Sequence, residues 1–103
     1  AHAEHGQSQH GGVVAEAGEA QFEIAGKDGR LTIYVTNHGA PVDTAGAIGK
    51  LTALTGSAKS EFDLKPAGDN RLQGQGSVAA GAKLLINVQW PGRKPLQARA
   101  VMN

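Results

Sequence analysis

The sequence predicts an all-β domain, either an antiparallel β-sandwich of immunoglobulin-like type or a small barrel, with about seven to eight strands. Two observations support this prediction. Short segments alternate apolar and polar residues with a period of two, which is typical of half-buried strands. Turn-forming residues, including many of the 15 glycines, separate these segments at intervals of roughly ten residues. A chain of 103 residues is long enough for one domain with one modest core.

The clearest predicted element is a hairpin in the first third of the chain. Apolar residues alternate with polar ones over residues 19–24 and again over residues 31–36. Asp28-Gly29 lies between the two segments, and this dipeptide is a strong signal for a tight hairpin turn. The second strand should end near Pro41, because proline cannot donate a hydrogen bond to a ladder.

Further strands complete the predicted domain. They are expected over residues 48–55, 61–64, 71–76, 84–90 and 96–102. The segment 46–55 is ambiguous because Ala and Leu are abundant there, so a short helix is the alternative to a strand. This rhythm of strands and turns accounts for residues 11–103, which we assign to the β-sandwich domain.

Residues 1–10 differ from the rest of the chain. They read AHAEHGQSQH, show no apolar periodicity and lead into Gly11-Gly12, so we predict a flexible tail that bears histidines. Ala1-His2-Ala3 fits the small-x-small pattern before a signal-peptidase cut, which predicts an exported protein with its signal peptide removed. The mature chain would then start at Ala1 or at Glu4. The alternative is that Ala1 marks the boundary of an expressed fragment.

Composition and motifs argue against several classes of function. Ten Lys and Arg residues against nine Asp and Glu give a net charge of +1, and the basic residues are scattered, so no nucleic-acid footprint is predicted. The chain has no cysteine, which excludes disulfides and thiol chemistry. No apolar run approaches the roughly 18 residues that a membrane-spanning helix needs. Because nucleophile-elbow, Walker and dinucleotide-binding motifs are also missing, we predict that the protein is not an enzyme.

Histidine placement is the exception to this lack of chemistry. Three of the four histidines, His2, His5 and His10, lie within the first ten residues together with Glu4. Neutral imidazole is a common metal ligand that suits Zn, Cu and Ni, and a carboxylate adds a harder donor. We therefore predict a divalent ion, Cu(II), Zn, Ni or Co, held weakly because a flexible tail loses entropy when it wraps an ion. His38, in the turn after the second hairpin strand, would be either a further ligand or a solvent-facing turn residue.

An ordered series of short motifs resembles a known group of proteins. The series is His10-Gly11-Gly12-Val13-Val14, Gln21-Phe22-Glu23-Ile24, residues 29–35, Gly39-Ala40-Pro41-Val42 and residues 66–72. It resembles small periplasmic β-sandwich proteins associated with bacterial heavy-metal resistance, and a β-rich module of the periplasmic adaptor proteins of heavy-metal efflux pumps. The resemblance implies a periplasmic location and a role in handling copper, zinc, cobalt or nickel. Of the family-like positions, the histidine of the His-Gly-Gly motif is His10, and the resemblance carries over no set of metal ligands.

Two hypotheses for function follow. The first is a periplasmic metal-binding accessory protein, acting as a chaperone, buffer or sensor beside an efflux-system protein. The second is a non-enzymatic protein–protein interaction module of a periplasmic complex, with a solvated polar tail that binds no metal. The sequence does not identify the metal, the partner protein or the oligomeric state.

Overall fold

The computed structural model describes residues 10–102, and this part of the chain contains nine β-strands and no helix. None of its elements is therefore a helix that could cross a membrane. The strands are β1 (Val13–Ala17), β2 (Ala20–Lys27), β3 (Arg30–Asn37), β4 (Ala40–Pro41), β5 (Ile48–Thr55), β6 (Ala58–Pro66), β7 (Arg71–Gln75), β8 (Lys83–Gln89) and β9 (Leu96–Val101). The predicted all-β fold is confirmed.

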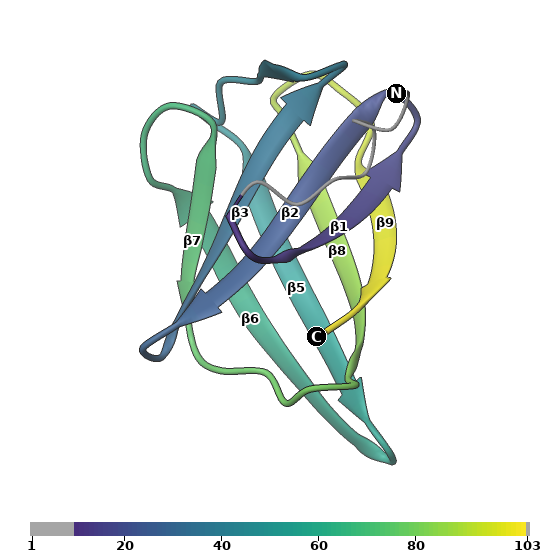
Figure 1. The fold of residues 1–103 in the computed structure, drawn as a ribbon. Helices are drawn as coiled ribbons and strands as arrows, with labels where there is room; N and C mark the ends of the chain where they lie inside the picture. Colours follow the sequence, from purple (N-terminus) through teal and green to yellow (C-terminus); the bar gives the residue numbers. More distant parts are fainter. Residues whose placement is uncertain (1–9, 103) are drawn as a thin grey trace, which may run out of the picture.

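The strands form an antiparallel sheet that curls until it nearly closes into a barrel (Figure 1). Their order is β1-β2-β3-β7-β6-β5-β8-β9, with the short β4 paired to β3. The two end strands, β1 and β9, lie beside each other and bring the edges of the sheet together. β6 pairs with β5 along most of its length but with β7 only at its last residues, so it joins the two halves of the barrel.

The predicted hairpin is present as β2 and β3, and its register follows from its turn. Asp28 and Gly29 occupy the two-residue loop with φ angles of 55° and 76°, the left-handed conformation that a tight primed turn requires. Lys27 therefore pairs with Arg30, and each pair further along the hairpin follows in step. One of these pairs places Glu23 directly opposite Tyr34.

The segment that was ambiguous in the sequence is a strand. β5 pairs with β6 on one side and with β8 on the other, so it is a central strand of its half of the barrel. Gly49, Leu51 and Ala53 point inward and are buried, while the residues between them face outward. This period of two favours a strand over the alternative helix because only a strand places all three on one face.

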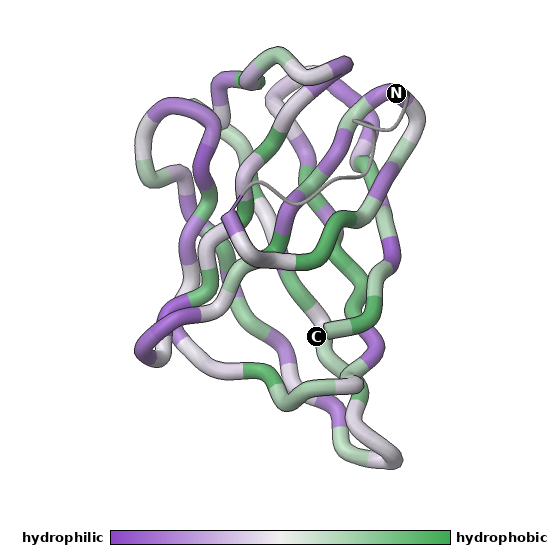
Figure 2. Tube along the Cα trace, viewed as in Figure 1, coloured by the Kyte–Doolittle hydropathy of each residue, from purple (hydrophilic) through white to green (hydrophobic). Residues whose placement is uncertain are grey.

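A single core fills the barrel, built from the inward-facing residues of both halves. The large apolar side chains with no exposed surface are Phe22, Ile24, Leu31, Ile33, Val35, Leu51, Leu72, Ile86 and Val88. Figure 2 shows hydrophilic residues gathered at the β2–β3 turn and along the β6–β7 connection, while apolar residues recur along the strands. The core is thus formed by apolar residues that alternate with polar or more exposed ones along the strands.

Candidate functional site

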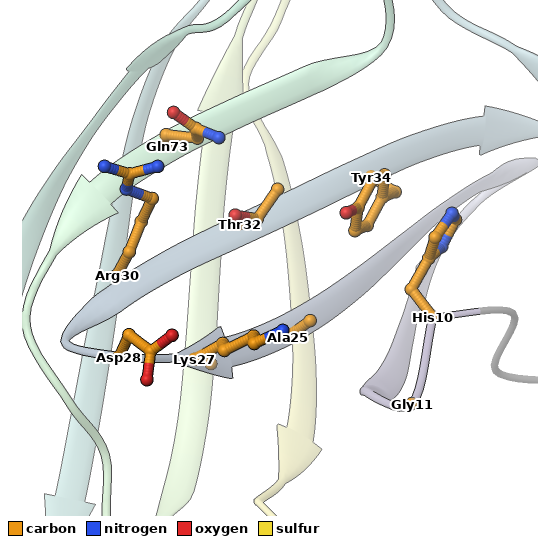
Figure 3. A pocket seen from close by; sticks show the side chains of 10 residues that line it. His10, Gly11, Ala25, Lys27, Asp28, Arg30, Thr32, Tyr34 and Gln73 are labelled. Atoms are coloured by element: carbon orange, nitrogen blue, oxygen red, sulfur yellow. The ribbon is translucent and has the colours of Figure 1, made fainter.

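The outer face of the β2–β3–β7 part of the sheet is hollowed beside His10 (Figure 3). The hollow has a volume of about 490 Å³ and a polar floor, to which β3 contributes Arg30, Thr32 and Tyr34 and β7 contributes Gln73. Outward-facing residues of neighbouring strands line it because alternate side chains of a strand share one face. His10 stands at one end of the hollow, facing Tyr34 (Figure 3).

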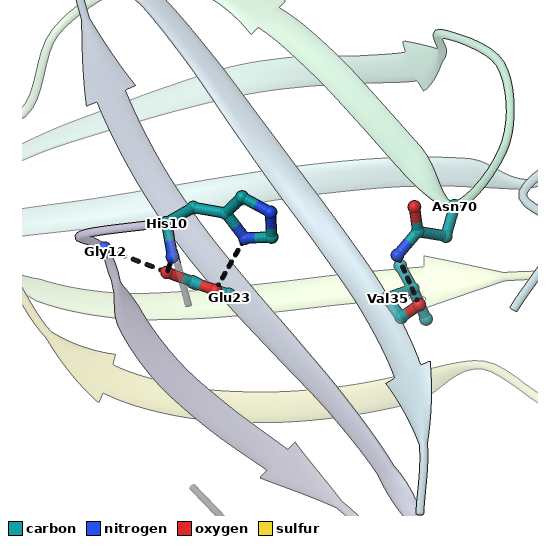
Figure 4. Close-up of polar contacts among 5 residues, drawn as sticks. All are labelled: His10, Gly12, Glu23, Val35 and Asn70. Carbon is teal, nitrogen blue, oxygen red and sulfur yellow. Dashed lines mark hydrogen bonds and ion pairs between the residues drawn. The ribbon is translucent and has the colours of Figure 1, made fainter. Parts of the chain in front are cut away.

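Glu23 on β2 anchors His10 to the sheet (Figure 4). Its Oε2 accepts hydrogen bonds from the main-chain N–H groups of His10 at 2.7 Å and of Gly12 at 2.9 Å. Its Oε1 lies 3.0 Å from the imidazole Nδ1 of His10. Glu23 is only 6% exposed although it points to the outer face, because residues 10–12 cover it. The alternation of residues 19–24 correctly places Glu23 on the face opposite to Phe22 and Ile24, but that face is covered at this position.

Gly12 allows this segment to lie so close to the sheet. A Cβ atom added at Gly12 would overlap the main-chain carbonyl oxygen of Ile24 on β2. This carbonyl belongs to a paired strand, so it cannot move without disturbing the hydrogen bonds of the sheet. Gly11 has a φ of 78°, which glycine adopts at little cost. The Gly11-Gly12 pair thus turns the chain and presses it onto β2, which directs the N–H groups of residues 10 and 12 at Glu23.

Tyr34 fixes the plane of the His10 ring. The two rings stack with their centroids 3.6 Å apart and their planes within 7° of parallel. Because Tyr34 is the cross-strand partner of Glu23, the hairpin register alone brings the stacking ring and the anchoring carboxylate side by side. The His10 side chain remains 42% exposed, so one part of the ring is held by the protein and another is open to solvent.

The contacts of His10 determine which of its nitrogens can bind a ligand. An ionised carboxylate can only accept hydrogen bonds, so Nδ1 of His10 carries the proton that points at Glu23. In the neutral ring Nε2 then has the lone pair, and it points away from Glu23 in Figure 4. Tyr34 covers a face of the ring, whereas the Nε2 lone pair lies in the ring plane, so stacking leaves it accessible. Metal-bound histidines usually donate the N–H of the other ring nitrogen to a carboxylate, a main-chain carbonyl or a water molecule, and a carboxylate is in place here.

His38 lies in the turn between β3 and β4, in a different environment. Its φ of 51° is left-handed, its side chain is 63% exposed, and its Nε2 is 3.2 Å from Oε1 of Glu19. The two histidines in the described part of the chain are thus paired with different carboxylates. Within residues 10–102 no three His, Asp or Glu side chains come together as a metal-binding group. The other predicted ligands, His2, Glu4 and His5, lie outside the described residues.

Sequence reasoning identified His10 but missed Glu23 and Tyr34. The Asp28-Gly29 turn is the signal that could have found their pairing, since counting back from a two-residue turn places residues 23 and 34 opposite each other. Nothing in the local pattern indicated that His10 would lie over this pair.

Three comparisons of the chain, with protein-family models, with curated proteins and with solved structures, found no match. Any statement about function therefore depends on the geometry of the site and on the residues themselves.

Proposed function

We propose that this chain binds a divalent transition-metal ion through Nε2 of His10, with His2, His5 and Glu4 as further ligands. The observation that supports the proposal is the 3.0 Å contact between Nδ1 of His10 and Oε1 of the buried Glu23. This contact orients the ring, holds the proton on Nδ1 and makes Nε2 a better donor to a metal. Imidazole and carboxylate ligands together suit Zn, Cu(II), Ni and Co.

The arrangement favours a site that takes up and releases its ion. His10 is already ordered by Glu23 and Tyr34, so little side-chain entropy is lost when this ligand binds an ion. Residues 1–9 connect directly to His10 and contain the other predicted ligands, His2, Glu4 and His5. One ordered ligand combined with ligands from a short peptide suits a chaperone, buffer or sensor better than a permanent structural site.

The wider role follows from the resemblance of the His10-Gly11-Gly12 region and the strands after it. We propose an accessory protein of a periplasmic heavy-metal resistance or efflux system, which would pass the ion to, or sense it beside, an efflux-system protein. The proposal assigns no enzymatic step to the chain.

Titration of the full chain with Zn(II) and Cu(II), followed by calorimetry, tests the proposal. His10→Ala should weaken binding by about tenfold or more, because it removes the one pre-oriented ligand. His38→Ala is the matched control, since it removes an exposed histidine that is paired elsewhere, and it should leave the affinity unchanged. Equal affinities for the parent chain and His10→Ala would contradict the proposal.

A second candidate function is a protein–protein interaction module that needs no metal. The observation that favours it is a pair of exposed apolar residues on the outer face of the β5–β8–β9 half: Leu54, 40% exposed, and Val101, 57% exposed. Both pair with Lys83 of β8 from opposite sides, so they lie on one face with a cation between them. On this alternative, neither ion at millimolar concentration would shift the NMR signals of His10.

A further inference from the structure

A second hollow lies at the end of the barrel where β3 ends and β9 begins, at the top of Figure 1. Its volume is about 620 Å³, and it shares no lining residue with the hollow beside His10. Its walls are largely apolar and come from both halves of the barrel: Ala20, Val35, Val42, Trp90 and Leu96. Hollows of this size with apolar walls at the mouth of a barrel are typical sites for small ligands.

Trp90 forms a rigid wall of this hollow. Its indole N–H donates a 2.8 Å hydrogen bond to the main-chain carbonyl of Asp43, which holds the ring in one orientation. The ring is half-buried and packs against the core next to the end of β8. A half-buried indole whose polar atom is already satisfied offers an apolar surface to a ligand without an orphaned donor.

Two cations stand at the rim. Arg93 and Lys94 line the hollow from the β8–β9 loop, and both are exposed. The loop is tied down at Arg93, whose main-chain N–H donates to the carbonyl of Trp90 at 3.1 Å and whose carbonyl accepts from the Gln89 side chain at 3.0 Å. Within residues 10–102, neither cation takes part in an ion pair.

The charge at the rim favours an anion. Asp43 is the one acidic residue lining the hollow, and its Oδ1 accepts a 2.9 Å hydrogen bond from the main-chain N–H of Ala45 in its own loop. Two cations against one carboxylate leave the lining with a net positive charge. A carboxylate head group would pair with Arg93 or Lys94 through charge-assisted hydrogen bonds while its apolar body lies against Trp90.

We propose that this hollow binds a small organic acid with an apolar body and a single carboxylate. The inference is independent of the metal site, because no residue serves both. Hexanoate is the probe, with hexan-1-ol as the neutral molecule of similar shape and acetate as the head group alone. Trp90 is the only tryptophan of the chain, so its fluorescence reports on this hollow alone.

In a titration of the full chain, hexanoate should change the Trp90 emission saturably, with a dissociation constant on the order of 1 mM for so small a ligand. Hexan-1-ol should bind about tenfold more weakly, because it cannot pair with the cations. Acetate should give no saturable change. The absence of saturation by about 50 mM hexanoate, or equal affinities for the acid and the alcohol, would overturn the proposal.

Charge variants test where the acid binds. The double variant R93Q/K94Q should weaken hexanoate by about tenfold. The matched control is K83Q/R99Q, which also removes one Lys and one Arg, but from the outer face of β8 and β9. This control should keep the parent affinity. If both double variants weaken hexanoate equally, the effect is one of net charge and the proposed site is wrong.

Discussion

Replacing Glu23 by glutamine tests how the anchoring of His10 controls its chemistry. Glutamine keeps the shape of the side chain but has one carbonyl oxygen and one NH₂ group in place of two acceptors. The oxygen can take the place of Oε2, which now receives the main-chain N–H groups of His10 and Gly12 at 2.7 and 2.9 Å. The NH₂ group then faces Nδ1 of His10, so that Nδ1 must accept a hydrogen bond and the ring proton must move to Nε2.

The cost in stability follows from the change in charge. Hydrogen bonds to a charged group contribute about 1.5–3 kcal/mol, against about 0.5–1.5 kcal/mol for neutral ones. The two main-chain hydrogen bonds remain but become weaker. Part of this loss in stability is offset, because the variant no longer has to bury a charged carboxylate. We therefore expect Glu23→Gln to lower the free energy of unfolding by about 1–2 kcal/mol. Metal affinity should fall by about 10–100-fold, because Nε2 must lose a proton before it can bind.

Urea unfolding followed by fluorescence gives the free energy, and calorimetric titration with Zn(II) gives the affinity. Glu23→Ala is the companion variant, and it should cost more stability than Glu23→Gln, because no acceptor is left for the N–H groups of residues 10 and 12. If Glu23→Gln kept both the parent stability and the parent affinity, the His10–Glu23 contact would have no role in either property.

Three further variants test other features of the structure by urea unfolding. Gly12→Ala should cost about 2 kcal/mol and detach His10 from the sheet, because the new Cβ would overlap the carbonyl of Ile24; unchanged stability would refute the close approach. Leu51→Ala should cost about 3 kcal/mol, because it opens a cavity at a fully buried central position; a loss below about 1 kcal/mol would mean that the core collapses around it. His38→Ala should change stability by less than about 0.5 kcal/mol, because its ion pair with Glu19 is exposed on both sides; a larger loss would show a structural role for that turn.

The fold was predictable because its signals are local. The pattern of short apolar segments and turns predicted every strand longer than two residues except β1, and the Asp28-Gly29 turn sets the register of β2 against β3. The helix alternative for residues 46–55 was open in the sequence because alanine and leucine suit either structure there. Pairing of β5 with strands on both sides decides between them, and this pairing involves residues far along the chain.

The site was predictable only in part. Clustering of histidines pointed to His10, but its partners come from strands that the sequence separates from it by at least 13 residues. Glu23 shows the limit of periodicity, which assigns a side chain to a face of the sheet but does not reveal what covers that face. Gly12 shows another limit, because glycines needed for turns and a glycine needed for close approach look alike in a sequence.

The proton position on His10 is the most direct test of the proposed metal site. Long-range ¹H–¹⁵N NMR of the metal-free chain, at a pH where imidazole is neutral, distinguishes the two ring tautomers. The account predicts that His10 carries its proton on Nδ1, and that Zn(II) shifts the Nε2 signal of His10 while leaving His38 in place. A proton on Nε2 of His10, or a Zn(II) response confined to His38, would contradict it.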